Sequence, residues 1–167
     1  IPLENIAEGK LVKDIEVYPV TSLKQLVLHL NGVQKIKPLP KENILRNLDR
    51  AYDVDFSDVK GQPVARRALE IAAAGGHSIL MMGSPGCGKT MLARRLVTIL
   101  PPVTEAEALE ITKIYSIVNM LPNAESVMVE RPFRSPHHSV SASALLGGGT
   151  YPRPGDVTLS HNGVPFL

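Results

Sequence analysis

Several residue types are scarce in this chain. Its 167 residues include one cysteine, no tryptophan and only 4% aromatic residues. A single cysteine excludes a disulfide within the chain, which favours a reducing, cytoplasmic environment. The few aromatic rings provide no platform for stacking nucleic-acid bases. The formal net charge of +2 is too small to indicate a nucleic-acid partner by itself.

Long hydrophobic segments are also missing. No apolar run approaches the roughly 18 residues that suggest a membrane-spanning helix, and the N-terminal residues lack the basic-then-apolar order of a signal peptide. Apolar residues still make up 44% of the chain, which is ordinary for a globular domain. We therefore expect a globular protein without a membrane partner.

The most informative motif covers residues 83–90, which read Gly-Ser-Pro-Gly-Cys-Gly-Lys-Thr. They match the G-x-x-x-x-G-K-[ST] loop, whose backbone N–H groups bind phosphate. The glycines permit backbone angles that other residues rarely adopt and let the main chain approach a phosphate closely. In such a loop the Lys89 ammonium reaches the β- and γ-phosphates and the Thr90 hydroxyl binds Mg²⁺.

The flanks of this phosphate loop fit the motif. The apolar run 78–82 predicts a buried strand that enters the loop. Residues 91–100 predict a helix that leaves it and that stops at two prolines. The apolar positions on one face of that helix are Leu92, Leu96 and Ile99. Strand, loop and helix therefore stand in the required order.

Cys87 occupies a variable position of the loop, where we expect no chemical role of its own. Lys89 and the N-terminus of the following helix should nevertheless favour its thiolate. Because a bulky adduct on the thiol would obstruct the phosphates, alkylation is expected to block nucleotide binding.

The chain before the loop divides into two parts. Residues 1–32 contain a predicted strand at 15–18 and a predicted helix between Ser22 and Asn31-Gly32. Residues 33–54 combine lysines and prolines and are interpreted as a linker. The N-terminal part is too small to bury both of its elements, so we expect it to be the end of a larger domain.

Residues 55–167 are predicted to form the domain that contains the phosphate loop. Its first helix is expected at 63–74, with Val64, Arg67, Ala68 and Ile71 along one side. Further helices are predicted between Thr104 and Pro122 and at 141–146, an irregular or extended segment at 131–138, a loop at 151–155, and a strand from Val164.

Four segments together resemble the ComM/YifB family of bacterial AAA+ ATPases, which is related to the magnesium-chelatase ATPase subunit. They are the phosphate loop, 55–62 (Asp-Phe-Ser-Asp-Val-Lys-Gly-Gln), 131–138 (Arg-Pro-Phe-Arg-Ser-Pro-His-His) and 155–163 (Gly-Asp-Val-Thr-Leu-Ser-His-Asn-Gly). The resemblance implies an α/β fold. A P-loop NTPase AAA+ core, with a parallel sheet and flanking helices, would follow the C-terminal remnant of a Lon-protease-like (ribosomal S5 domain 2-like) domain.

The resemblance also implies a function. ATP and Mg²⁺ would be the cofactors, Lys89 and Thr90 the catalytic residues, and Thr90 the metal ligand. Val59 and Gln62 would lie near the adenine, and the remaining nucleotide-binding residues would be Gly83, Ser84, Pro85, Gly86, Cys87, Gly88, Lys89, Thr90 and Met91. The complete protein would form a homo-oligomeric, hexameric ring with ATP between subunits.

Such a ring would drive DNA translocation or branch migration, linked to natural transformation. Two alternatives stay open: a magnesium-chelatase-type ATPase subunit that drives metal insertion by a partner, and a nucleotide-binding module without turnover. Partner-dependent metallation of a porphyrin would identify the first alternative, and ATP binding without hydrolysis the second.

The same resemblance predicts a fragment that is open at both ends. Residues 163–167 match the Walker B strand, whose two acidic residues would come directly after Leu167. The chain as given is therefore expected to bind ATP weakly at most and not to hydrolyse it. Pro165 stands where the family usually has an aliphatic residue. A proline donates no N–H to a sheet, so either the local pairing is altered or the activity is impaired.

Other polar residues are open to simpler interpretations. His137 and His138, with His77 and His161, are expected to be structural, because neighbours in a strand point to opposite faces and no cysteine or carboxylate cluster accompanies them. Arg131, Arg134 and Arg153 fit two roles: contact with DNA phosphates in a ring pore, or pairing with carboxylates at a subunit interface. Arg94-Arg95 is expected on a solvated or interface face.

Overall fold

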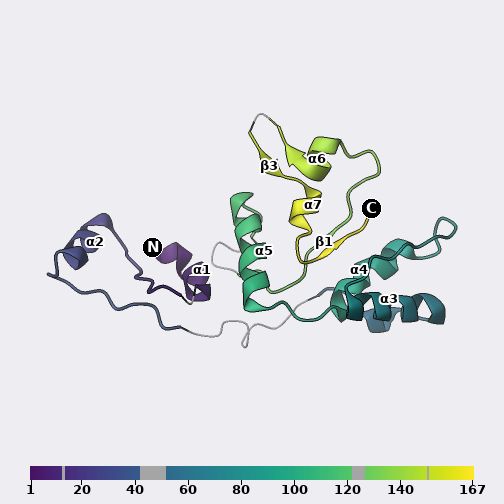
Figure 1. Ribbon diagram of the computed structural model, residues 1–167, viewed down its shortest axis with the longest axis horizontal. Helices are drawn as coiled ribbons and strands as arrows, with labels where there is room; N and C mark the ends of the chain where they lie inside the picture. The colour runs from purple at the N-terminus through teal and green to yellow at the C-terminus, as the bar shows by residue number, and fades with distance from the viewer. Residues whose placement is uncertain (13, 42–51, 122–126, 150) are drawn as a thin grey trace. The chain divides into compact units, whose positions relative to one another are not determined.

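The structure, a computed structural model, describes residues 1–12, 14–41, 52–121, 127–149 and 151–167 (Figure 1). The chain forms two compact units. Unit 1 comprises Ile1–Asp49 and Glu105–Val129, and unit 2 comprises Arg50–Thr104 and Glu130–Leu167. Among the described residues, no helix combines the length and the apolar character that crossing a membrane requires.

Unit 1 is mainly helical. Its elements are the 3-10 helix η1 (Leu3–Asn5) and the α-helices α1 (Ile6–Leu11), α2 (Leu23–Leu30) and α5 (Glu105–Ile117). Helix α2 begins as predicted, because the Ser22 hydroxyl accepts a hydrogen bond from the Gln25 N–H at 3.3 Å. It also ends as predicted, at Asn31, before Gly32 with a φ of 73°.

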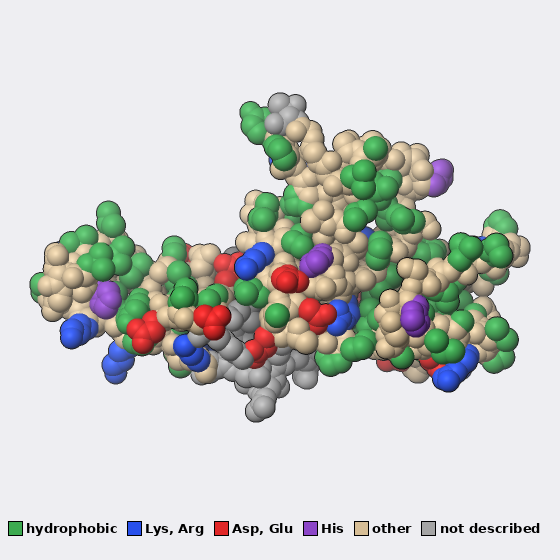
Figure 2. Space-filling view, in the orientation of Figure 1, with side chains coloured by type: hydrophobic (Ala, Val, Ile, Leu, Met, Phe, Trp, Pro, Cys, Tyr) green, Lys and Arg blue, Asp and Glu red, His purple; other side chains and the backbone are tan. Residues whose placement is uncertain are grey.

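The strand predicted at 15–18 is not formed. Tyr18 O accepts from the Ile1 amino group at 2.9 Å, and Val17 O accepts from Leu39 N–H at 2.7 Å. These bonds are isolated and do not form the ladder of a sheet. The β-bridge found here among the described residues pairs Pro2 with Val20. Leu23, Val27 and Leu30 of α2 are exposed, and hydrophobic side chains gather on the surface over this helix (Figure 2). That residues 1–32 are the end of a larger domain stays a prediction.

Unit 2 contains the elements around the phosphate loop. In chain order they are η3 (Phe56–Asp58), α3 (Pro63–Gly75), α4 (Lys89–Ile99), β1 (Phe133–Arg134), α6 (Ala142–Leu146), β2 (Gly147–Gly148), β3 (Arg153–Pro154), α7 (Asp156–Leu159) and β4 (Val164–Pro165). The three predicted helices α3, α4 and α6 are confirmed. The segment expected to be a loop at 151–155 contributes β3, which pairs antiparallel with β2.

Apolar packing joins α3, α4 and the segment before α3. The buried cluster consists of Phe56, Val59, Leu69, Ala73, Leu92 and Leu96. Helix α4 buries the face that was predicted for it. Helix α3 does not: Val64 is 82% exposed and Ile71 is also exposed, whereas Leu69, Ala72 and Ala73 are buried. The small alanines allow α3 to approach α4 closely, which a count of large apolar residues does not reveal.

A small parallel sheet confirms the α/β class. Strands β1 and β4 are parallel, with Phe133 opposite Val164 and Arg134 opposite Pro165. Val164 N–H donates to Pro132 O and Phe166 N–H donates to Arg134 O, both at 2.8 Å. Because alternate residues of a parallel strand bond to opposite sides, the nitrogen of Pro165 faces away from β1. The proline therefore does not alter this pairing.

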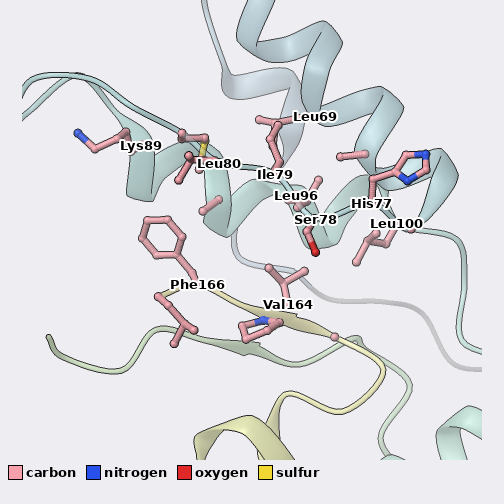
Figure 3. Close-up of a pocket in the computed structure, with 17 residues that line it drawn as sticks. Leu69, His77, Ser78, Ile79, Leu80, Lys89, Leu96, Leu100, Val164 and Phe166 are labelled. Atoms are coloured by element: carbon pink, nitrogen blue, oxygen red, sulfur yellow. The ribbon is translucent and has the colours of Figure 1, made fainter. Parts of the chain in front are cut away.

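The prediction of a buried strand at 78–82 is wrong. These residues form no strand, and Leu80 and Met82 are 82% and 86% exposed. A cavity of about 590 Å³ lies between this segment and β4; its walls include Ile79 and Leu80 on one side and Val164 and Phe166 on the other (Figure 3). Sheet hydrogen bonds need neighbouring backbones about 4.8 Å apart, and the cavity separates the two segments.

We expect the purified chain of residues 1–167 to self-associate, because the segment 78–82 combines exposed apolar side chains with a backbone that lacks sheet partners. Size-exclusion chromatography with light scattering would measure this. Leu80→Lys is expected to shift most of the protein toward monomer, whereas Gln34→Lys adds the same charge elsewhere and should not. A wild-type monomer that unfolds cooperatively on heating would contradict the prediction.

Candidate functional site

The loop 83–88 connects the segment 78–82 to helix α4. Gly86 and Gly88 have φ angles of 80° and 91°, which residues with a Cβ rarely adopt. At Gly83 a Cβ would lie 2.8 Å from the Cys87 sulfur, so a larger residue there would require the Cys87 side chain to move. Gly86 and Gly88 thus permit the backbone path of the loop.

Lys89 is the first residue of α4, and its ammonium folds back into the loop. It donates hydrogen bonds to the carbonyls of Gly83 at 2.8 Å and Ser84 at 2.9 Å, and it lies 3.6 Å from the Cys87 sulfur. The helix N-terminus adds a positive field at the same place. Two sources of positive charge, the Lys89 ammonium and the N-terminus of α4, thus converge on the loop, which suits an anion.

The neighbouring predicted residues are accessible. Ser84, Pro85, Cys87 and Thr90 are exposed, while Met91 is half-buried against the core. No group of three or more histidine, cysteine, aspartate or glutamate side chains gathers as a metal site within the described ranges. A Mg²⁺ ion fits here only with Thr90 as a protein ligand and with phosphate oxygens and water as the others, which is a common arrangement for this ion.

The two residues predicted near the adenine lie in different environments. The Val59 side chain is fully buried in the core, so only its main chain could contact a ligand. Gln62 is exposed, has a left-handed backbone with φ 49° and ψ 52°, and donates from Nε2 to the Cys87 carbonyl at 3.2 Å. The structure thus brings Gln62, but not the Val59 side chain, to the loop.

Contacts between the segment 55–58 and α4 were not predicted. The sequence placed Arg94-Arg95 on a solvated or interface face. Arg94 is exposed, whereas Arg95 pairs with Asp58 at 3.2 Å and is mostly buried. Phe56 N–H also donates to the Thr98 hydroxyl at 3.1 Å. The partners in these contacts are 37 or more positions apart in the chain, so no local sequence pattern predicts them.

The start of this segment is capped. The Asp55 carboxylate accepts from the Ser57 N–H at 2.6 Å, and Asp55 N–H donates to the Asp58 carboxylate at 3.1 Å. A side-chain hydrogen bond from Ser57, followed by the one from its backbone, lowers the pKa of Asp55. The charged carboxylate therefore favours this turn, and α3 begins at Pro63, five positions after Asp58.

Two of the three arginines considered for DNA or interface contacts bind within the chain. Arg131 donates to the carbonyls of Pro101 and Asn162, each at 2.7 Å, and of Pro102 at 3.3 Å. Arg134 Nε donates to the Asp156 carboxylate at 2.8 Å. The guanidinium groups of these two residues therefore connect parts of unit 2, and the two roles considered from the sequence stay predictions.

The histidine pair also differs from the expectation. The rings of His137 and His138 lie with their centroids 4.0 Å apart and so do not point to opposite faces. The chain turns directly after them, where His137 Nδ1 lies 2.8 Å from the Ser139 hydroxyl. Side chains of neighbouring residues point to opposite faces only in a strand, and His137 and His138 are not in a strand.

Comparisons with known proteins show the family of the chain. The family profile described as "Magnesium chelatase, subunit ChlI" matches residues 55–167. Over its whole length the chain is 45% identical to "Competence protein ComM" of Haemophilus influenzae and covers 33% of that protein. Over 96% of its length it is 51% identical to the YifB protein of Escherichia coli and covers 29% of it. The chain thus spans about a third of the length of these curated relatives.

Arg134→Ala is expected to lower the stability of the full-length protein by about 1–3 kcal/mol, because it leaves the mostly buried Asp156 carboxylate without its charged partner. Thermal unfolding would show a lower melting temperature. Arg153→Ala, at an exposed arginine, serves as the matched control and should leave the melting temperature unchanged. Equal melting temperatures for the two variants would contradict the structural role of Arg134.

Proposed function

The chain belongs to the magnesium chelatase subunit ChlI family and, within it, to the ComM/YifB group, and we propose that it carries the ATP-binding part of an AAA+ ATPase. The observation that supports this best is the loop 83–90, in which the Lys89 ammonium and the N-terminus of α4 place positive charge on the same loop. ATP and Mg²⁺ are the ligands that suit this arrangement.

The residues of the loop have distinct roles in this proposal. Lys89 gives up the carbonyls of Gly83 and Ser84 and neutralises charge on the phosphates, while main-chain N–H groups of the loop donate to phosphate oxygens. Thr90 binds Mg²⁺, which supplies further charge neutralisation. Because phosphoryl transfer depends mainly on positioning and charge, these residues are necessary for turnover but act with others in the complete protein.

For the full-length protein we propose ATP-driven DNA translocation or branch migration by a hexameric ring in the cytoplasm. This part rests on the relatives, since the Haemophilus protein carries the name of a competence protein. The family description supports a second candidate, a chelatase-type ATPase subunit that drives metal insertion by a partner. A nucleotide-binding module without turnover is the third.

ATP turnover by the full-length protein, with and without branched DNA, separates these candidates. We expect DNA to stimulate turnover, and Lys89→Ala to lower it about 100-fold or more, as when a preorganised donor to developing charge is removed. Chelation of Mg²⁺ should have a similar effect. ATP binding without turnover, even with DNA present, would contradict the motor and favour one of the other two candidates.

Alkylation of Cys87 is expected to block ATP binding, because the thiol lies exposed in the loop, 3.6 Å from the Lys89 ammonium. Bound ATP should in turn slow the alkylation. Mass spectrometry of the peptide that contains Cys87 would measure both effects. Cys87→Ser should bind ATP and resist the reagent, whereas equal labelling rates with and without ATP would show that the thiol lies away from the phosphates.

A further inference from the structure

The structure brings Gln62 to the phosphate loop from outside the motif. Its side-chain Nε2 donates to the Cys87 carbonyl at 3.2 Å. The same amide also lies over the next residue, since a Cβ on Gly88 would be 3.5 Å from Gln62 Nε2. The hydrogen bond therefore holds the peptide unit between Cys87 and Gly88, directly before Lys89, and the Gln62 amide lies beside that unit.

The backbone of Gln62 is arranged for this contact. A left-handed conformation is uncommon for a residue with a side chain, yet Gln62 adopts it, with φ 49° and ψ 52°. Pro63 follows, and a proline disfavours the right-handed helical conformation for the residue before it. The Gln62 carbonyl accepts from Arg66 N–H at 3.0 Å and so caps α3, which leaves the side chain available to the loop.

We infer that Gln62 is a positioning residue that fixes the Cys87–Gly88 peptide so that the Gly88 N–H is presented to phosphate. In a trans peptide the C=O and N–H groups point in opposite directions, and no described peptide bond is cis. Binding the Cys87 carbonyl on the side of α3 therefore directs the Gly88 N–H away from α3. Glycine at position 88 makes rotation of this peptide easy, so an outside contact is needed to select one orientation.

This inference rests on the proposed function, because it assigns Gln62 to the phosphate end of the nucleotide. It predicts that Gln62 acts on ATP and on inorganic tripolyphosphate alike. A residue that contacts the adenine would affect ATP alone, since tripolyphosphate has no base. The ratio of the two effects therefore distinguishes positioning of the loop from contact with the base.

The test uses the full-length protein and three variants. Gln62→Met keeps the approximate size of the side chain but removes the amide donor, and Gln62→Gly removes the side chain while relieving the left-handed backbone. Gln34→Met is the matched control at an exposed glutamine of unit 1. We expect both Gln62 variants to bind ATP and tripolyphosphate roughly three- to ten-fold more weakly, the loss of about one hydrogen bond, with the control unchanged.

Hydrogen exchange without ligand provides a second readout, in which the peptides covering residues 83–92 should exchange faster in both Gln62 variants. Unchanged affinity and exchange, a loss for ATP alone, or a loss in Gln62→Met that Gln62→Gly restores would each overturn the inference. The last result would indicate backbone strain as the cause. A wild-type protein that binds neither ligand would contradict the proposed function, and the exchange rates would still decide whether Gln62 orders the loop.

Discussion

The phosphate loop depends on the apolar contact between α3 and α4. Val59, Leu69 and Leu92 meet in this contact and are almost completely buried. Burying side chains of this size stabilises the unit by roughly 1.5–3 kcal/mol each, as an upper estimate. The contact fixes where α4 begins, and α4 begins at Lys89. It also places the residues before α3 beside the loop, so that one packed surface aligns the lysine, the helix N-terminus and Gln62.

Charge determines what the loop does once it is positioned. The Lys89 ammonium binds the carbonyls of Gly83 and Ser84, which are partial negative charges of the loop itself. A polyphosphate carries full negative charges and would compete with these carbonyls for the ammonium. The main-chain N–H groups of the loop would then donate to the phosphate oxygens. In the proposed function, the exchange of two neutral acceptors for charged ones would give the loop a preference for anions. The glycines have no side chain that would resist a rearrangement of the loop backbone.

Features that depend on neighbours in the chain were predicted well. The cap at Ser22, the start of α3 at Pro63 and the positive φ angles of Gly86 and Gly88 follow from residues within a few positions of one another. Features that depend on distant partners were not. The segment 78–82 has the composition of a strand but no adjacent strand to bond, and Arg95 finds Asp58 far away in sequence. Arg131 and Arg134 likewise bind Asn162 and Asp156, partners within the chain that no local pattern identifies.

Pro165 illustrates how geometry decides a question that composition raises. A proline inside a parallel sheet removes one donor, and the sequence leaves open whether this disturbs β4. The bonds from Val164 and Phe166 show that β4 addresses β1 with the residues on either side of the proline. The missing donor falls on the opposite edge, which borders the cavity next to the segment 78–82. Any backbone that pairs along this edge must therefore do so without a bond from position 165, whereas the pairing with β1 loses nothing.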